Sequence, residues 1–82
     1  MFFVYILRSG KGVRYYIGCT KDVARRLAQH NAGMTQATRN LRPWLLVHTE
    51  EYQTLVAARR REAHIKSWKS PEYMRRALGL PD

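Results

Sequence analysis

Five side chains in this sequence have the types that acid–base and metal chemistry require. Tyr5 and Tyr16 stand in two apolar stretches on either side of a glycine-containing turn, and Arg26 and His30 follow four residues apart. Glu62 is a lone acid in a long basic stretch. Phosphodiester hydrolysis needs a base for water, positive charge for the pentacovalent phosphate and a metal for the leaving oxygen. These residue types can supply all three.

The elements that must position these residues are short and clearly bounded. The first quarter reads as a β-hairpin, and capping residues at Thr20 or Asp22, Thr54 and Ser70 predict three helices. The order is ββαβαα, an α+β arrangement. The predicted elements are strands at 2–8, 13–19 and 44–50, helices at 20–33, 54–69 and 70–80, a turn at 9–12 and a polar, basic loop at 34–42.

Length and charge limit the possible functions. A chain of 82 residues buries a small core, so we expect residues 1–82 to form a single domain with a shallow surface site. The formal net charge of +9 attracts polyanions, and nucleic acid is the expected partner. The lone Cys19 excludes a disulfide framework and a thiolate zinc cluster.

Nothing in the sequence indicates a membrane protein. The longest apolar run, from Phe2 to Leu7, is too short to span a bilayer and lacks the basic n-region of a signal peptide. We therefore expect a cytoplasmic protein without a membrane partner, and a monomer.

The hairpin bears on how the two tyrosines are placed. If its turn centres on Gly10–Lys11, Tyr5 lies directly opposite Tyr16 on the same face of the sheet. A change in loop length would break this pairing. Two core tyrosines with satisfied hydroxyls are the alternative interpretation.

The first helix separates two adjacent arginines. At about 100° per residue, Val23 and Leu27 define its apolar face, with Arg26 and His30 on the flanks and Arg25 toward solvent. An inward arginine either pairs with an anion or packs its stem and extends its head to water. Both interpretations stay open for Arg26.

Glu62 lies inside the apolar stripe of the second helix, although it is an acid. A surface pair with Lys66 at i,i+4 is one explanation, but it does not account for a carboxylate on the core side. The other is a Mg²⁺ site, because Mg²⁺ is often held by one carboxylate together with water and phosphate oxygens. The apolar members of the stripe are Leu55, Ala58, Ile65 and Trp68.

Four motifs together resemble the GIY-YIG nuclease domain over essentially the whole chain. They are "VYIL" at 4–7, "YIG" at 16–18, "ARRLAQHN" at 24–31 and "RREAHIKSWKS" at 60–70. The chain is most similar to small stand-alone bacterial members, akin to the nuclease domain of the excision-repair endonuclease C subunit. It departs from the family name at Phe3 and Val4, which replace Gly-Ile, and it has no asparagine after residue 62.

The resemblance implies a small three-stranded antiparallel sheet flanked by helices and a metal-dependent DNA endonuclease with a role in DNA repair. The catalytic residues that it implies are Tyr5, Tyr16, Arg26, His30 and Glu62, with Glu62 holding Mg²⁺ or Mn²⁺. It favours Tyr5 as the base, with Tyr16 positioning water or phosphate.

The implied mechanism also requires particular groups near the tyrosines. A free tyrosine is a poor base at neutral pH, so we expect nearby cations to lower its pKa. Gly18 is expected to let backbone or a phosphate approach closely.

Six further cations are candidates for binding nucleic acid. Arg39 and Arg42 belong to the polar loop, which is either a substrate contact or a solvated connector. The helix contributes Arg59, Arg60, Lys66 and Lys69.

Two alternatives to a nuclease stay open. One is a nucleic-acid-binding module without cleavage. The other is a basic adaptor that binds a protein through exposed Trp44, Trp68 or Tyr52.

Overall fold

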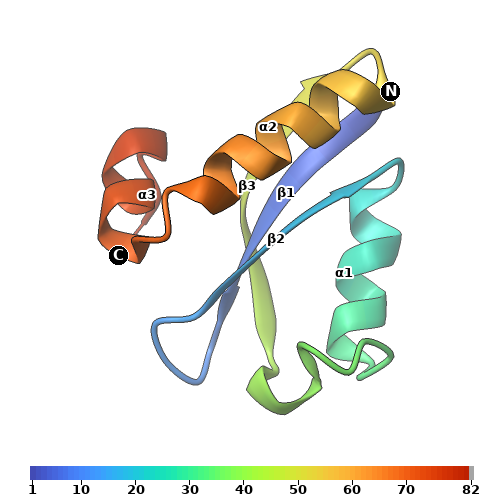
Figure 1. Cartoon of the computed structure of the whole chain (residues 1–82). Coiled ribbons are helices and arrows are strands. Elements are labelled where there is room, and N and C mark those ends of the chain that lie inside the picture. The colour runs from blue at the N-terminus through green and yellow to red at the C-terminus, as the bar shows by residue number, and fades with distance from the viewer. Residues whose placement is uncertain (82) are drawn as a thin grey trace.

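The computed structural model describes residues 1–81 as an α+β fold built on one three-stranded antiparallel sheet (Figure 1). The strand order is β2-β1-β3, so the first strand is central and the other two are edges. The predicted element order is confirmed, and most predicted bounds differ by one to three residues. The elements are β1 (Phe2–Ser9), β2 (Tyr15–Thr20), α1 (Val23–Asn31), the short 3-10 helix η1 (Arg39–Leu41), β3 (Trp44–Tyr52), α2 (Leu55–Ser67) and α3 (Pro71–Leu78).

Helices cover both faces of the sheet, which explains the continuous apolar run of β1. Val4 and Ile6 pack in one core with α2 and α3. Tyr5 and Leu7 pack on the opposite face, in a second core with α1. A central strand buried on both sides needs apolar side chains at every position rather than at alternate ones.

The three predicted helix starts are confirmed. Asp22 accepts a hydrogen bond from the backbone N–H of Arg25 at 3.0 Å and so caps α1. Thr54 and Ser70 cap α2 and α3 in the same way. These side chains satisfy backbone donors that the first turn of a helix leaves free. No helix within residues 1–81 has the length and apolarity to cross a membrane.

The predicted hairpin register is wrong. Tyr5 lies opposite Gly18 rather than Tyr16, and Tyr16 lies opposite Leu7. The loop is longer than expected, because the N–H of Ser9 bonds the carbonyl of Arg14 at 2.9 Å. Since the pairing shifts by two residues, both tyrosines still share one face.

A β-bulge moves Trp44 to the α1 face. Ile6 pairs with His48 but Leu7 pairs with Leu46, which leaves Val47 as an extra residue in β3. In a regular strand with all of residues 44–48 paired, Trp44 would share the face of His48. Trp44 is instead 3% exposed beside Tyr5, so the expectation of an exposed anchor at this tryptophan is wrong.

The apolar stripe of α2 is shorter than predicted. Ala58 and Ile65 are buried, and Trp68 packs partly against the same core. Leu55 is 41% exposed, so its assignment to the buried stripe is wrong. Leu55 is the first residue of α2, where the helix begins beyond the core.

A charged network ties α2 to β3. Arg61 of α2 donates to both carboxylate oxygens of Glu50, and His48 and Tyr52 also bond this carboxylate. Burial by itself would raise the pKa of Glu50, but these hydrogen bonds hold the pKa at about 2. The network therefore favours the ionised form of a partly buried acid.

We expect Glu50→Gln to lower the free energy of unfolding at neutral pH by about 1.5–3 kcal/mol, the contribution of hydrogen bonds to a charged group. The folded-state pKa lies below the ordinary value of 4.5, so this stability is present above 4.5 and is lost as pH falls toward 2. Denaturant unfolding of wild type and variant across this range measures the effect.

The neighbouring, exposed Glu51 provides the control. Glu51→Gln should leave the acid limb of the stability curve unchanged. Equal losses from the two substitutions would contradict a special role for Glu50.

Candidate active site

The candidate site is built around a fully buried histidine. His30 is 0% exposed, and its Nε2 lies 3.0 Å from the hydroxyl of Tyr5. Its Nδ1 lies 2.8 Å from Oγ1 of Thr38. Helix α1 brings His30 under the sheet because Val23 and Leu27 bury the same side of the helix.

The neighbours of His30 assign its tautomer. The Thr38 hydroxyl donates to the carbonyl of Thr35 at 3.4 Å, so its oxygen accepts from Nδ1–H. Nε2 faces two donors, the Tyr5 hydroxyl and, at 3.5 Å, a guanidinium nitrogen of Arg26. Burial lowers the pKa of His30, and the charge of Arg26 lowers it further. His30 is thus a neutral acceptor for the Tyr5 proton.

The side chain of Tyr5 extends over Gly18 to the edge of the sheet. Its side chain is buried, and a Cβ placed on Gly18 would come within 2.6 Å of the Tyr5 hydroxyl. The space that was expected to admit backbone or phosphate is occupied by the Tyr5 ring. Because β2 is an edge strand, the ring extends from the centre of the sheet to its margin.

The second tyrosine completes an aromatic group. The Tyr16 ring lies 4.6 Å from the His30 ring and 6.1 Å from the Tyr5 ring, centroid to centroid. Tyr16 is only half-buried, so it presents an aromatic side chain at the surface of the site. The two tyrosines are diagonal neighbours across β1 and β2 rather than direct partners.

The two adjacent arginines differ as their helical spacing predicts. Arg25 is exposed, whereas Arg26 is half-buried and donates to the side chain of Gln29 at 2.6 Å. Burial raises the pKa of Tyr5, and the nearby Arg26 offsets only part of that rise. The expectation that a nearby cation lowers the Tyr5 pKa is therefore wrong for Arg26 taken alone, because the desolvation of the phenol outweighs its charge.

Glu62 approaches from the other face of the sheet. Its carboxylate accepts a hydrogen bond from Lys66 at 2.9 Å, so the predicted i,i+4 pair is formed. Helix α2, which carries Glu62, packs against β2. Burial raises the pKa of Cys19 on that strand, and the charge of Glu62 raises it further. Cys19 follows Gly18, so Tyr5 and α2 approach adjacent residues of β2 from opposite faces.

The site is better suited to a metal ion that takes part of its ligands from a substrate than to one enclosed by protein side chains alone. Residues 1–81 contain no group of three or more His, Cys, Asp or Glu side chains that could enclose an ion. The Glu62 side chain is 13% exposed and has one ionic partner, Lys66. A single carboxylate fits Mg²⁺ when water and phosphate oxygens supply the remaining ligands.

The predicted nucleic-acid-binding cations fall into two groups. In the loop, Arg39 donates to the carbonyl of Gly33 at 3.0 Å and Arg42 donates to the carbonyl of Arg39 at 2.8 Å. Figure 1 shows this segment at the end of the sheet away from α2. The other group is exposed along and just after α2 and consists of Arg59, Arg60, Lys66 and Lys69.

Three residues of the site were missed by sequence reasoning. Thr38 orients His30 from within the polar loop, and Gln29 holds Arg26. Asn31 bonds both the N–H and the carbonyl of Trp44. The "HN" of the helix motif marks Asn31, but no local pattern marks Thr38, because its partner is eight residues away.

Gly18→Ala should displace the Tyr5 ring, because the new methyl group would lie 2.6–2.8 Å from the ring and the hydroxyl. We expect a loss of about 1–3 kcal/mol of unfolding free energy, typical of overpacking in a core. Histidine NMR should also show the Tyr5–His30 hydrogen bond weakened. Gly12→Ala is the control, because a Cβ there meets nothing within 4 Å.

Gly12 has a φ of 143°, so its alanine variant tests backbone strain without the clash. An unchanged His30 environment in Gly18→Ala would contradict the close approach of Tyr5 to β2.

Comparison with known proteins connects this geometry to a family. The GIY-YIG catalytic domain model matches residues 1–76. A UPF0213 protein of Halobacterium salinarum is 45% identical over 67 residues, which cover 80% of this chain and 86% of the relative. A UPF0213 protein of Staphylococcus aureus is 38% identical over 74 residues, 89% of each chain. No solved structure matches. The chain belongs to the GIY-YIG family, among the relatives of the small UPF0213 proteins.

Proposed function

We propose that residues 1–82 form a single nuclease domain, a metal-dependent endonuclease that hydrolyses phosphodiester bonds in DNA. One observation carries the proposal. The Tyr5 hydroxyl, bonded to neutral His30, lies against Gly18 of the edge strand β2, and α2 with Glu62 packs against the other face of that strand. A phosphate at this margin would meet a proton acceptor and a metal-binding carboxylate together.

His30 explains how a phenol with a raised pKa serves as a base. Tyr5 need not ionise in advance, because its hydroxyl already donates to Nε2 of His30. As Tyr5 takes a proton from the attacking water, its own proton passes to the imidazole. Thr38 holds the opposite nitrogen and keeps Nε2 free to accept. In this mechanism Tyr5 and His30 act as one proton-accepting unit.

Arg26 supplies the fixed positive charge of the site. Its guanidinium is oriented by Gln29 and lies beside Tyr5, Tyr16 and His30. A preorganised cation of this kind stabilises negative charge as it develops on the phosphate. Tyr16, half-buried with its ring tilted by 57° to that of His30, positions water or a phosphate oxygen.

Glu62 would hold the Mg²⁺ or Mn²⁺. Such an ion, when bound, stabilises the charge on the leaving oxygen. Lys66 neutralises Glu62 in its absence and keeps the carboxylate extended along α2. We propose further that DNA phosphates bind the cations of the loop and of α2, and that the protein acts in DNA repair as a cytoplasmic monomer.

A nucleic-acid-binding module without cleavage is the second candidate. The Glu62–Lys66 hydrogen bond favours it, because a carboxylate paired in this way can serve structure alone. Cleavage assays separate the two functions.

The first assay replaces Glu62 with Gln, which keeps the shape of the side chain and removes its charge. We expect cleavage of labelled strands, junctions and flaps in Mg²⁺ to fall by at least about 100-fold, in line with the several kcal/mol that a metal supplies. DNA binding should persist, and EDTA should abolish wild-type cleavage.

Glu72→Gln, on the exposed start of α3, is the matched control and should cut at the wild-type rate. Full activity of Glu62→Gln, or activity in EDTA, would sink the assignment of the metal to Glu62.

The second assay compares the two adjacent arginines. Arg26→Ala should slow cleavage by about 10²–10³-fold, equivalent to about 2.7–4 kcal/mol, if Arg26 is a fixed electrostatic donor. Arg25→Ala removes the same charge from the exposed side of α1 and should change mainly affinity and its salt dependence. Equal losses of rate at saturating DNA would refute the distinction between them.

A further inference from the structure

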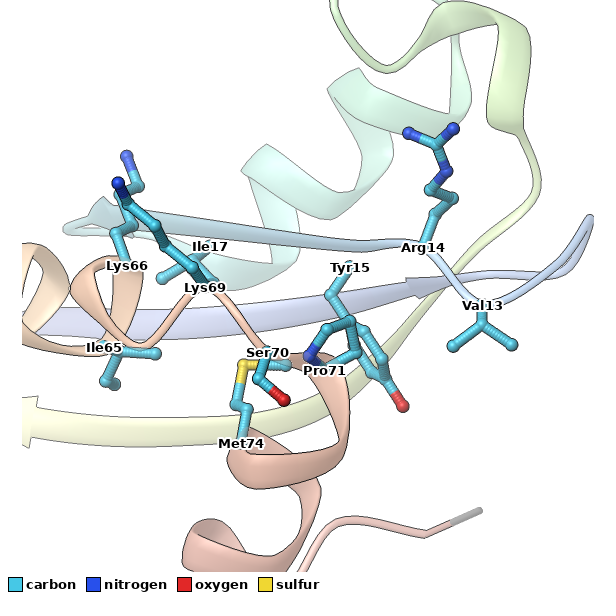
Figure 2. Close-up of a pocket in the computed structure, with 10 residues that line it drawn as sticks. All are labelled: Val13, Arg14, Tyr15, Ile17, Ile65, Lys66, Lys69, Ser70, Pro71 and Met74. Atoms are coloured by element: carbon cyan, nitrogen blue, oxygen red, sulfur yellow. The ribbon is translucent and has the colours of Figure 1, made fainter.

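A concave site lies on the face of the sheet opposite Tyr5 and His30. It is a pocket of about 220 Å³ where β2 meets the end of α2 and the start of α3 (Figure 2). This volume is smaller than that of a pocket for a drug-sized molecule, so it suits one ring or one side chain of a larger ligand. The function proposed above uses only the charges of Lys66 and Lys69 at its rim and leaves its apolar interior without a role.

The wall of the pocket is apolar and partly flat. Ile65 and Met74 belong to the core beneath it, and Ile17 packs on that core from β2. The Tyr15 ring and Pro71 add flat surfaces. The Tyr15 hydroxyl is buried without a hydrogen-bond partner among the described residues, so this wall residue carries a polar group that the protein leaves unsatisfied.

The rim of the pocket is cationic. Lys66 and Lys69 extend to the same side of it, and Arg14 stands at its other end (Figure 2). All three side chains are exposed and none faces an acid across the pocket, whose lining contains no carboxylate. The rim therefore favours an anionic ligand.

Lys69 is held in a conformation that glycine would adopt more easily. Its φ is 56°, in the left-handed region, and it is the only residue other than glycine within 1–81 with a positive φ. A side chain at such a position costs free energy, and strained residues of this kind gather where ligands bind. Lys69 directly follows the C-cap of α2, so its left-handed conformation ends that helix, and its side chain lines the pocket rim.

The pocket is continuous with the proposed catalytic margin. Lys66 of the rim donates to Glu62, and Tyr15 and Ile17 alternate along β2 with Tyr16 and Gly18 of the other face. From Cys19 to Tyr15 the strand advances about 13 Å, at about 3.3 Å per residue. A strand of nucleic acid that runs along β2 from Gly18 toward Tyr15 would reach this pocket.

We propose that the pocket receives an unpaired nucleobase of the strand that is cut, with the flanking phosphates on Lys66, Lys69 and Arg14. An apolar, partly aromatic cavity ringed by cations matches the chemistry of a nucleotide, in which a flat base joins an anionic backbone. In a duplex the bases are paired and stacked, so only a single-stranded segment can supply one. The inference rests on the proposed nuclease function and narrows its substrates to strands with an unpaired region beside the cleaved phosphate.

Binding in EDTA tests the pocket without relying on cleavage. The probes are a short oligodeoxyadenylate, an abasic chain with the same number of phosphates, and the same oligodeoxyadenylate in a duplex. The base-bearing single strand should bind about 5- to 150-fold more tightly than the abasic chain, the range given by stacking of one base. The methyl NMR signals of Met74 and Ile17 should shift when the single-stranded oligodeoxyadenylate is added, and not when the abasic chain is added.

Two variants test the rim. Lys69→Gly suits the backbone of this position, so it should fold at least as stably as wild type while losing one phosphate contact. It should weaken both single-stranded probes equally and flatten the slope of log affinity against log salt by about 0.7. Arg76→Ala removes an exposed cation of α3 that does not line the pocket and should leave that slope unchanged.

Equal affinity for base-bearing and abasic chains, or methyl signals that do not move, would overturn the inference and leave the pocket to another occupant. Tighter binding of the duplex would overturn it as well. Cleavage by wild type together with equal affinity for base-bearing and abasic chains would refute the nucleobase pocket but not the nuclease function. Base discrimination without any cleavage in Mg²⁺ would refute the nuclease function and leave the pocket standing.

Discussion

The hydrogen bonding of one buried imidazole constrains the rest of this structure. A fully buried histidine costs free energy unless both ring nitrogens have partners, and His30 has Tyr5 on one side and Thr38 on the other. Those partners come from the first strand and from the loop after α1. The loop is fixed further by Trp44, whose indole N–H bonds the Thr38 carbonyl at 2.8 Å. Satisfying His30 therefore joins strand, helix and loop in one arrangement.

The edge position of β2 allows a thin sheet to carry two sites. Alternate residues of a strand face opposite sides, so Tyr16 and Gly18 belong to the α1 face while Ile17 and Cys19 belong to the α2 face. If β2 were a central strand, the strands on either side of it would prevent one ligand from reaching both sets of side chains. At an edge they meet along one accessible margin, where an extended ligand can contact both.

Much of this arrangement could be predicted from the sequence, because it depends on local periodicity and capping. The spacing of α1 separated Arg26 from Arg25 and placed His30 on the buried flank, and the caps marked where helices begin. The family motifs marked the two tyrosines and Glu62, whose catalytic roles stay predictions.

The remaining features depend on long-range geometry that local patterns do not encode. The Tyr5–Gly18 pairing follows from a longer hairpin loop, and the burial of Trp44 follows from one extra residue in β3. Neither glycines nor alternating side chains fix a loop length or a bulge position. Thr38 acquires its role only when the loop folds back on α1.

The few acids of this basic chain are used in two physically different ways. Glu50 has three hydrogen-bond donors and a pKa of about 2, so removing any partner leaves a partly buried charge short of a bond. Glu62 has a single donor, Lys66, whose side chain is 53% exposed. An i,i+4 pair of this kind is worth only a few tenths of a kcal/mol, so a phosphate anion can take Lys66 away from Glu62 at little cost. The carboxylate of Glu50 is thus committed to holding α2 on the sheet, whereas Glu62, one turn beyond Ala58, can exchange its partner without unfolding the helix.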